Sequence, residues 1–380
     1  MALTQVETSG LSGSGASSNS TTGNVFSQTG PFKNRIINGD MRIDQRNAGA
    51  SVTPTSGAYL VDRFYYAATQ ASKFTAQRNA GSVTPPAGFT NYLGLTVASS
   101  VSVGAGDTFY FGQIVEGFNI ADFNWGSAAA QAITFSFWVR SSLNGTHSGT
   151  VANAAIVRTY VFSFQINSPN TWEYKTITVP GDTSGTWYTD NTAGLYLLFN
   201  LGSGSNFSGT TGSWTTATKI GATGATSVVG TNGATFYITG VQLEAGSVAT
   251  PFERRSYGQE LALCQRYYYR ISGSDTSSSN VGVYGVGFSQ STTAGRAVVE
   301  FPVTMRIFPT ALEQSGTASH YRIIAGSSGG INCSAVPTFT TSSVKSIDVS
   351  WTVASGATAN QGVLFMSSNA ASYIGASAEL

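Results

Sequence analysis

The stretch Thr250–Ile271 reads TPFERRSYGQELALCQRYYYRI and divides this chain of 380 residues into two β-rich parts. It is the densest cluster of charge in the sequence, and it predicts a helix over Ser256–Ile271. Ser256 is the expected N-cap, with Gln259 three residues further on as in a capping box. A lone charged helix between two β-rich blocks is expected to act as a joint, so residues 254–271 are assigned to a helical connector.

A narrow apolar stripe follows the predicted helix, with spacings of four, three and four residues: Tyr257, Leu261, Cys264 and Tyr268. This spacing resembles a heptad seam, but it covers less than two heptads and is too short for a stable coiled coil by itself. We expect the stripe to be an oligomer interface where copies of the chain meet. The alternative is that it packs against the chain's own domains.

Residues 34–253 alternate apolar and polar side chains over many short stretches, which is typical of half-buried strands. In one of them the apolar face carries Ile133, Phe135, Phe137 and Val139, and the opposite face carries Thr134, Ser136, Trp138 and Arg140. A later strand, from Phe236 to Leu243, is expected to bulge or bend at Gly240. Many short antiparallel strands separated by glycine-rich turns predict a β-sandwich, most simply a jelly roll.

Residues 272–380 alternate again, and Tyr284, Val286 and Phe288 are expected on one face. This predicts a second, smaller β-sandwich. Its glycine-punctuated strand around Val281–Phe288 offers little side chain to fill a core, which favours close packing against another chain. Residues 1–33 form a polar tract that cannot bury enough apolar area to order alone. The tract is either a disordered tail or a virion-attachment segment that orders on a partner.

Composition excludes several classes of protein. Only 10% of the residues are charged, compared with about 25% in typical soluble domains, and the net charge is +1. A nucleic-acid-binding protein normally shows a basic surface, so no nucleic-acid partner is expected. The sequence contains no run of about 18 to 20 apolar residues, so membrane insertion is not expected. It also shows no secretory signal at its start. The two cysteines, Cys264 and Cys333, are expected to be free.

Signals of catalysis are weak. The two histidines, His147 and His320, lie in different blocks without metal-ligand spacing, and no nucleophile, phosphate-loop or zinc motif is present. A glycosidase needs two carboxylates about 5 to 9.5 Å apart, and the acidic residues here are scattered. The sequence therefore predicts a protein that is not an enzyme and has no cofactor. A polysaccharide depolymerase is the lesser alternative.

Sugar binding is the more plausible chemistry, because exposed aromatic rings stack on the apolar face of a pyranose while polar side chains bind its hydroxyls. Loops of the first block supply such sets. The candidate carbohydrate-binding residues are Asn124, Trp125, Trp172, Trp187, Tyr188, Asp190 and Trp214. The competing interpretation is that an aromatic-rich protein buries most of these rings in its core.

Several stretches resemble a known family. Asn34–Arg46 (NRIINGDMRIDQR) with Tyr59–Tyr65 (YLVDRFY) resembles the opening of bacteriophage tail-fibre and receptor-binding proteins. Phe236–Phe252 (FYITGVQLEAGSVATPF), continuing into the connector, resembles their junction, and the final SYIGASAEL resembles their closing strand. The first block is also similar to carbohydrate-binding jelly rolls.

This resemblance implies a homotrimeric tail fibre that is attached to the tail through its N-terminal segment and binds host-surface polysaccharide. It also implies assembly in the host cytoplasm and residence on the virion tail. A capsid decoration or tail adaptor protein without sugar binding is the alternative. The similar jelly rolls often hold a structural calcium ion, but this chain has Thr239 and Gly240 where they carry an acidic residue. No metal is therefore expected, and Asp40 is left as a weak calcium candidate.

Overall fold

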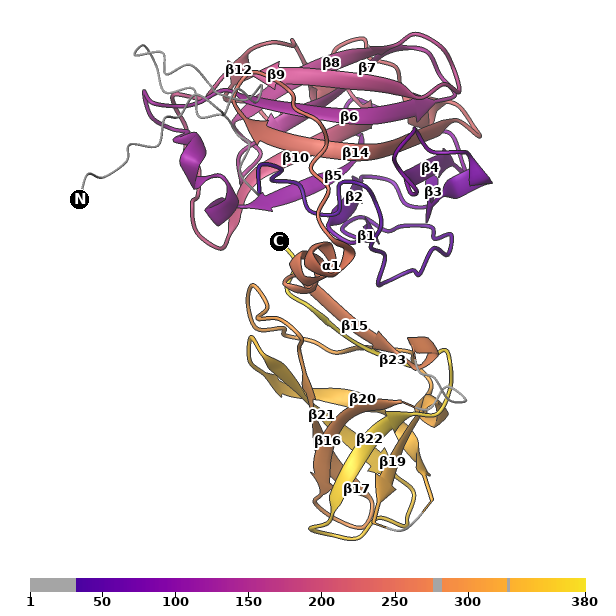
Figure 1. The fold of residues 1–380 in the computed structure, drawn as a ribbon. Helices are drawn as coiled ribbons and strands as arrows, with labels where there is room; N and C mark the ends of the chain where they lie inside the picture. Colours follow the sequence, from indigo (N-terminus) through magenta and orange to yellow (C-terminus); the bar gives the residue numbers. More distant parts are fainter. Residues whose placement is uncertain (1–31, 276–281, 327–328) are drawn as a thin grey trace, which may run out of the picture.

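The computed structural model describes residues 32–275, 282–326 and 329–380, and shows a β-sandwich and a β-barrel joined by a short helical segment (Figure 1). The predicted all-β class is confirmed. In the described ranges, no helix is long and apolar enough to cross a membrane. The N-terminal segment expected over residues 1–33 lies, apart from Phe32 and Lys33, outside the described residues.

The first block consists of two facing antiparallel sheets with a jelly-roll-like arrangement. In spatial order, the seven-stranded sheet contains β1 (Tyr59–Val61), β2 (Phe64–Ala68), β5 (Thr108–Glu116), β10 (Ala193–Ser203), β7 (Gly145–Ala152), β8 (Thr159–Ile166) and β12 (Trp214–Thr215). The five-stranded sheet contains β3 (Phe74–Arg78), β4 (Leu93–Val97), β14 (Thr235–Ala245), β6 (Ile133–Ser141) and β9 (Glu173–Val179). A small parallel pair, β11 (Ser208–Gly209) and β13 (Gly221–Ala222), completes the block.

The core of the sandwich lies between these two sheets. The side chains buried there confirm the apolar face that the alternation predicted for residues 133–139. Phe135, Phe137 and Val139 of β6 are fully buried, and Phe135 contacts Phe162 of β8 with ring centroids 4.7 Å apart. Trp138, between them in sequence, points to the opposite side of the sheet. Aromatic and branched residues suit this half-buried pleated surface. Short 3₁₀ turns lie outside the sheets at Ala80–Ser82, Gly117–Asn119, Ala121–Phe123 and Val228–Gly230.

The bulge predicted at Gly240 is also confirmed. The pairing of β14 with β6 shifts between Thr239 and Gln242, and Gly240 has a φ of +62°. Glycine adopts this left-handed conformation without the penalty that a Cβ imposes. A Cβ at this position would also collide with the ring of Phe89, so the bulge leaves space for that ring against the strand.

The predicted helix is shorter than expected. Helix α1 spans Tyr257–Gln265, and the Ser256 side chain accepts a hydrogen bond from the backbone N–H of Gln259, as the capping motif predicts. The extension of the helix to Ile271 was wrong, because β15 (Tyr268–Ser272) is a strand that pairs with β23 (Tyr373–Ser377). Pairing with a strand about a hundred residues away prevails over the local helical pattern, and the run of tyrosines favours it.

The C-terminal block is a closed six-stranded barrel, which corrects the predicted second sandwich. Its strands, in spatial order, are β16 (Val283–Ser289), β17 (Ala294–Glu300), β21 (Ser346–Val353), β20 (Ile331–Ser342), β19 (Tyr321–Ala325) and β22 (Gly362–Ser367). Closure leaves no unpaired sheet edge. A small sheet of β15, β23 and β18 (Glu313–Gln314) connects the barrel to the helix, with 3₁₀ turns at Gly273–Asp275 and Ala318–His320.

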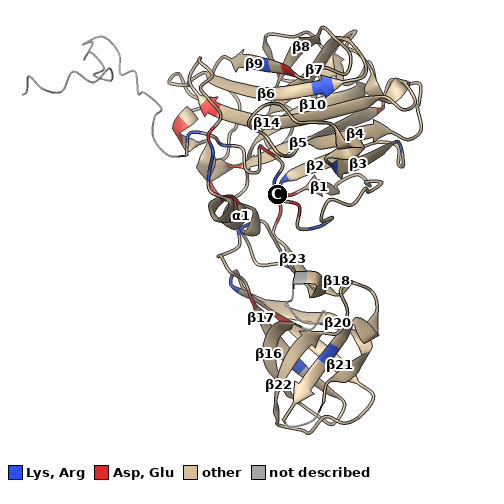
Figure 2. Ribbon diagram, turned by 45° about the vertical axis from the view of Figure 1, so that its right-hand side comes forward, with Lys and Arg blue, Asp and Glu red and all other residues tan. Residues whose placement is uncertain are grey.

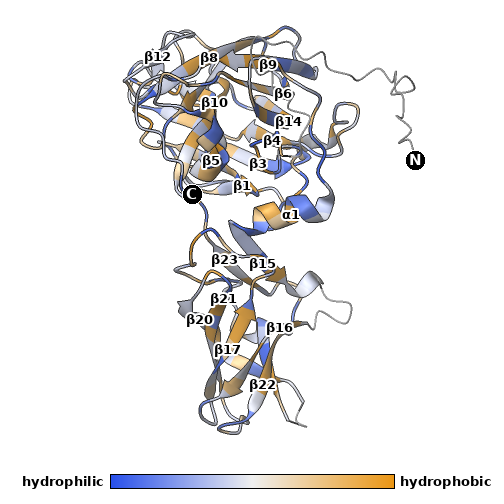
Figure 3. Ribbon diagram, turned by 60° about the vertical axis from the view of Figure 1, so that its left-hand side comes forward, coloured by the Kyte–Doolittle hydropathy of each residue, from blue (hydrophilic) through white to orange (hydrophobic). Residues whose placement is uncertain are grey.

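One predicted face of the barrel was wrong. Tyr284 is buried in the barrel, whereas Val286 and Phe288 are 61% and 48% exposed. The pairing of β16 with β22 shifts between Val283 and Gly285, and this irregularity moves Tyr284 to the opposite face. Hydrophobic and hydrophilic residues are interspersed along the barrel strands (Figure 3). The glycines of β16 instead allow close approach of β17 from the same chain, since a Cβ on Gly287 would overlap the carbonyl of Arg296.

The sandwich and the barrel meet through buried charges at the joint. Arg63 of the sandwich pairs with Glu379, and its guanidinium lies 3.5 Å from the ring centroid of Tyr267. Arg266 donates to both carboxylate oxygens of Glu116, at 3.0 and 2.5 Å. Charged residues are sparse on the ribbon and several of them lie near α1 and the C-terminal end (Figure 2). The stretches that resemble tail-fibre proteins therefore come together at one structural junction.

Candidate ligand-binding groove

A groove of about 470 Å³ opens on the outer face of the five-stranded sheet. Aromatic side chains dominate its lining, with one arginine among them. The lining residues are Phe89, Ser136, Trp138, Tyr174, Gly240, Pro251, Phe252 and Arg254. Concave apolar sites with a few placed polar groups are the usual form of small-ligand sites in proteins.

The floor of the groove is formed by neighbouring strands of the sheet. Trp138 of β6 lies directly opposite Tyr174 of β9 in the strand register, and their ring centroids are 5.4 Å apart. Ser136 lies two residues before Trp138 and therefore points to the same side. Tyr174 is 46% exposed. The pair presents aromatic surface to the solvent from a rigid sheet.

The wall of the groove comes from two other segments of the chain. Phe89 and Phe252 contact each other edge to face, with ring centroids 5.2 Å apart. The guanidinium carbon of Arg254 lies 4.9 Å from the centroid of Phe89 and 5.7 Å from that of Phe252. The wall is thus an aromatic pair that carries a cation.

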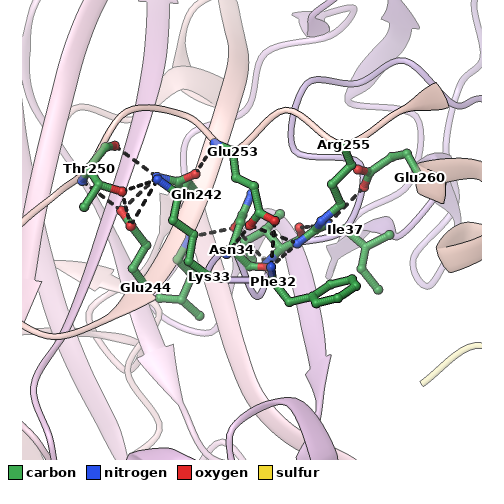
Figure 4. A network of polar contacts seen from close by, with 12 residues as sticks. Phe32, Lys33, Asn34, Ile37, Gln242, Glu244, Thr250, Glu253, Arg255 and Glu260 are labelled. Atoms are coloured by element: carbon green, nitrogen blue, oxygen red, sulfur yellow. Dashed lines mark hydrogen bonds and ion pairs between the residues drawn. The ribbon is translucent and has the colours of Figure 1, made fainter. Parts of the chain in front are cut away.

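The segment 246–255, which supplies Phe252 and Arg254, is anchored to the sheet by buried polar groups (Figure 4). The Gln242 side-chain amide donates to the carbonyl of Thr250 at 3.0 Å and accepts from the N–H of Glu253 at 2.7 Å. The Glu244 carboxylate accepts from the N–H of Thr250 at 3.0 Å. Because Gln242 and Glu244 are almost fully buried, these bonds are shielded from water and fix the position of the wall.

The same segment is also tied to the start of the sandwich. The Glu253 carboxylate accepts from the backbone N–H of Phe32 at 2.8 Å and from that of Asn34 at 2.7 Å. On the other side of the groove, the Thr239 hydroxyl donates to the carbonyl of Asn91 at 2.7 Å, close to the loop that bears Phe89. Both sources of the wall are therefore held to the sheet without a ligand.

Asp40, the weak calcium candidate, does not fit a metal site. Its carboxylate pairs with Arg42 at 2.5 Å, and burial raises its pKa while the charges of Arg42 and Arg254 act to lower it. Among the described residues, no group of three or more His, Cys, Asp or Glu side chains gathers where it could hold a metal ion. The Asp40 carboxylate is thus paired with the Arg42 guanidinium through one oxygen, and it belongs to no such group among the described residues.

Three of the predicted sugar-binding tryptophans pack against one another in a cluster. The ring centroid of Trp125 lies 4.5 Å from that of Trp187 and 5.3 Å from that of Trp214. Trp125 and Trp187 are both 8% exposed. Each indole N–H donates within the chain: to the Gln131 carbonyl, the Asp182 carboxylate and the Pro180 carbonyl, respectively. Trp125 and Trp187 therefore have little surface left for a ligand, which corrects their assignment, whereas Trp214 is partly exposed and its role in ligand contact stays a prediction.

Trp172 and Asn124, which directly precedes Trp125 in the chain, both lie outside the groove lining. The Trp172 indole donates to the Thr84 carbonyl at 2.9 Å, and its ring packs on Tyr92 with centroids 5.4 Å apart. Asn124 is exposed in a loop with a φ of +53°, and its side-chain amide donates to the Asp122 carbonyl at 3.1 Å. The structure does not bring either residue to the groove.

Tyr188 lines a different cavity, of about 400 Å³, whose other lining residues include Asn153, Val157 and Arg158. Its ring is 48% exposed, so its predicted role in ligand contact stays a prediction. Asp190 is exposed, and its carboxylate accepts from the N–H and hydroxyl of Thr192. These hydrogen bonds lower the pKa of Asp190.

The predicted oligomer stripe divides between the surface and the interior. Cys264 and Tyr268 are fully buried by this chain alone, so they have no surface left for a second copy. Cys264 packs with Ile37 and Ile43 of the sandwich, and Leu261 lies against the same cluster. Tyr257 is 58% exposed and stays a candidate contact. Both cysteines are free, as expected.

The histidines have structural surroundings. His147 is fully buried and lies against Phe164 and Phe236, and burial lowers its pKa although a hydrogen bond to the Leu143 carbonyl opposes the shift. His320 bonds the hydroxyl of Ser315 at 2.9 Å in the other block. The two side chains therefore lie in separate parts of the molecule.

The residues that line the groove were not predicted from the sequence because they come from five separate stretches of the chain. One signal was available. The alternation over residues 133–140 places Trp138 on the polar face of its strand, where a large aromatic side chain has no core to fill. Tyr174 has the same outward position on β9, between neighbours that are less exposed. Nothing in the sequence pairs these residues with Phe89, Phe252 or Arg254.

Comparisons with known proteins show likeness at the level of structure only. No family model matches the chain. No curated protein matches its sequence. A solved structure of the enzymatically active domain of tailspike protein 4 from bacteriophage CBA120 aligns with 57% of this chain at 11% identity, with a TM-score of 0.32. The aligned region spans only 22% of that tailspike chain.

Smaller proteins align over nearly their whole length. A putative sugar-binding protein from Bacteroides thetaiotaomicron aligns with 56% of this chain, and the alignment includes 99% of that protein. The identity is 11% and the TM-score is 0.32. A family 11 carbohydrate-binding module from Clostridium thermocellum aligns with 50% of this chain, and the alignment includes 92% of the module. The identity is 12% and the TM-score is 0.26.

Proposed function

We propose that the sandwich binds a glycan in the groove on its five-stranded sheet. The observation that supports this most is the Trp138–Tyr174 pair, which presents two aromatic rings from the floor of an open groove. Aromatic rings bury the C–H face of a sugar ring, and neighbouring polar groups bind its hydroxyls. Since the wall is already anchored, little ordering entropy opposes binding.

The wider role that we propose is attachment of a virion to its host through a surface polysaccharide, as part of the phage tail. This rests on the resemblance of the stretches at 34–46, 59–65, 236–271 and 372–380 to tail-fibre proteins. Attachment to other tail proteins through the N-terminal segment belongs to the same proposal. A virion protein that binds no sugar is the competing function, and the binding experiment below separates the two.

We also propose that the chain assembles as a homotrimer, with the outer face of the barrel between copies. Strand pairing places Ile324, Leu364, Val286 and Val298 side by side across β19, β22, β16 and β17. The last three are 38%, 61% and 43% exposed. Because this row of residues carries no charge, copies that meet along it do not repel one another. Several weak sugar sites on one trimer would also gain avidity of about 10² to 10⁴. Light scattering tests this, and a monomeric mass would contradict it.

A binding screen tests the proposed function. The purified protein is applied to an array of bacterial surface polysaccharides, together with Trp138→Ala and the control Phe308→Ala, which removes an exposed ring of the C-terminal block. We expect wild type and the control to bind the same polysaccharide and Trp138→Ala to lose it. Binding that persists in Trp138→Ala would reject the groove, and no binding by wild type would favour the structural role.

A further inference from the structure

Two consecutive arginines, Arg254 and Arg255, have opposite surroundings. Arg255 is buried, with its guanidinium 3.4 Å from the Glu260 carboxylate and 3.6 Å from that of Glu253, and it also donates to the Ile36 carbonyl. Arg254 is exposed at the groove and has no hydrogen bond or ion pair with any described residue. The structure therefore compensates one of these charges and leaves the other available.

No carboxylate of the groove neutralises Arg254. Among the lining residues, it is the only charged side chain. The carboxylate of Asp40 feels the field of Arg254, but Asp40 is already paired with Arg42 at 2.5 Å. The lining thus carries a net charge of about +1 beside two aromatic rings, and such a focused charge attracts anions.

The backbone beside Arg254 is also adapted to its position. Gly88 has a φ of +83°, and a Cβ there would lie 2.8 Å from Nη2 of Arg254. The guanidinium lies near Gly88, and its carbon is 4.9 Å from the ring centroid of Phe89 and 5.7 Å from that of Phe252. Because no described residue accepts a hydrogen bond from this guanidinium, its fork of N–H groups is available to donate to a planar anion.

From this arrangement we propose that the groove selects acidic glycans, and that Arg254 pairs with an anionic group of the bound sugar while Trp138 and Tyr174 stack on its ring. The inference rests on the proposed glycan binding and adds the charge of the ligand. A carboxylate and a phosphate ester both match the fork of N–H donors that arginine presents. The groove thereby distinguishes acidic polysaccharides from neutral ones of the same backbone.

The experiment compares matched ligands. Uronic-acid-containing capsular polysaccharides are tested in native form and after reduction of their carboxyl groups. Polysaccharides that carry pendant phosphate monoesters are tested before and after dephosphorylation, which leaves the backbone intact. The proteins are wild type, Arg254→Gln, Arg254→Lys and Trp138→Ala. Arg140→Gln is the control, because Arg140 lies on the same sheet face outside the groove lining and donates to the Asn170 carbonyl at 2.9 Å.

We expect wild type and Arg140→Gln to bind the acidic form about tenfold more tightly than its neutral counterpart, as a charge-assisted hydrogen bond provides. Arg254→Gln should lose this preference but keep the weaker binding of the neutral form, and Arg254→Lys should retain part of it. Added salt should weaken only the acidic ligand. Which acidic series shows the preference identifies the anionic group.

Two results would overturn the inference in different ways. Equal binding of acidic and neutral forms by wild type, lost in Trp138→Ala, would reject the role of Arg254 and leave the glycan-binding function in place. Failure of wild type to bind any polysaccharide in either form would reject both. As an independent check, Gly88→Ala should reduce the preference for the acidic form because the new methyl group displaces Arg254.

Discussion

Two aromatic clusters in the same sandwich differ in what their rings contact: one packs on itself, and the other faces an open groove. In the cluster of Trp125, Trp187 and Trp214, the rings pack on one another and every indole N–H has an acceptor in the chain. In the groove, Trp138 and Tyr174 face an open volume. The first arrangement is complete without a ligand, whereas the second leaves apolar area that only a further molecule can cover. Aromatic content alone therefore does not locate a binding site.

Charge shows the same contrast. Beside the tryptophan cluster, Arg158 donates to both carboxylate oxygens of buried Asp182, at 2.8 and 2.5 Å. Beside the groove, Arg254 has no such partner among the described residues. Arg158 thus forms a structural ion pair beside its aromatic rings, whereas Arg254 is available to bind a ligand. The variants below test this division between fold and binding.

The largest effect is expected from Trp187→Ala. Removal of a buried ring leaves a cavity and takes away one of the hydrogen bonds to Asp182, whose carboxylate stays paired with Arg158. Such truncations lower the free energy of unfolding by about 3 to 5 kcal/mol. Denaturant unfolding measures the loss, and any protein that remains folded should bind glycan as wild type does. A near-normal stability would show that the cluster is not a structural core.

Trp138→Ala should have the reverse effect. Truncation of a central aromatic anchor typically costs about 2 kcal/mol or more of binding free energy, whereas a partly exposed site costs less than about 1 kcal/mol of stability. Calorimetric titration with the polysaccharide found in the array, alongside denaturant unfolding, compares the two costs. A large loss of stability without loss of binding would remove the distinction between the clusters.

Thr250→Val tests whether the wall of the groove is held in advance. The substitution keeps the shape of the side chain but removes its hydroxyl contact with buried Glu244. Loss of one partner of a buried polar group costs about 1 to 3 kcal/mol. We expect reduced stability and a severalfold weaker affinity. Unchanged affinity would mean that segment 246–255 does not position Phe252 and Arg254 for binding.

The smallest effect concerns pH. Burial keeps the pKa of His147 below its ordinary value of 6.5, so the unfolded chain binds more protons than the folded chain below that pH. The free energy of unfolding should therefore fall as the pH drops below about 6.5. His147→Phe should lack this part of the slope when unfolding is measured at pH 7.5 and pH 5. An identical slope would contradict the shift.

The sequence was sufficient for the parts of the fold that follow from local pattern. The alternation in β6, the bulge at Gly240 and the Ser256 cap were all predictable, because neighbouring residues determine each of them. Strand β15 and the closed barrel were not, since their partners lie far along the chain. The groove could not be predicted for the same reason. The alternation placed Trp138 correctly on the outer face of the sheet, but Phe89 and Arg254 come close to Trp138 only in the folded chain.

The paired strands β15 and β23 have a mechanical consequence. They run side by side from the barrel to the joint, so the barrel is connected to the sandwich by two strands of the chain rather than by one (Figure 1). A pull on the far end of the barrel is shared between them, and Glu379, just beyond β23, is clamped by Arg63 in the sandwich. Tension on the barrel is thereby passed to the sandwich along two strands and one ion pair.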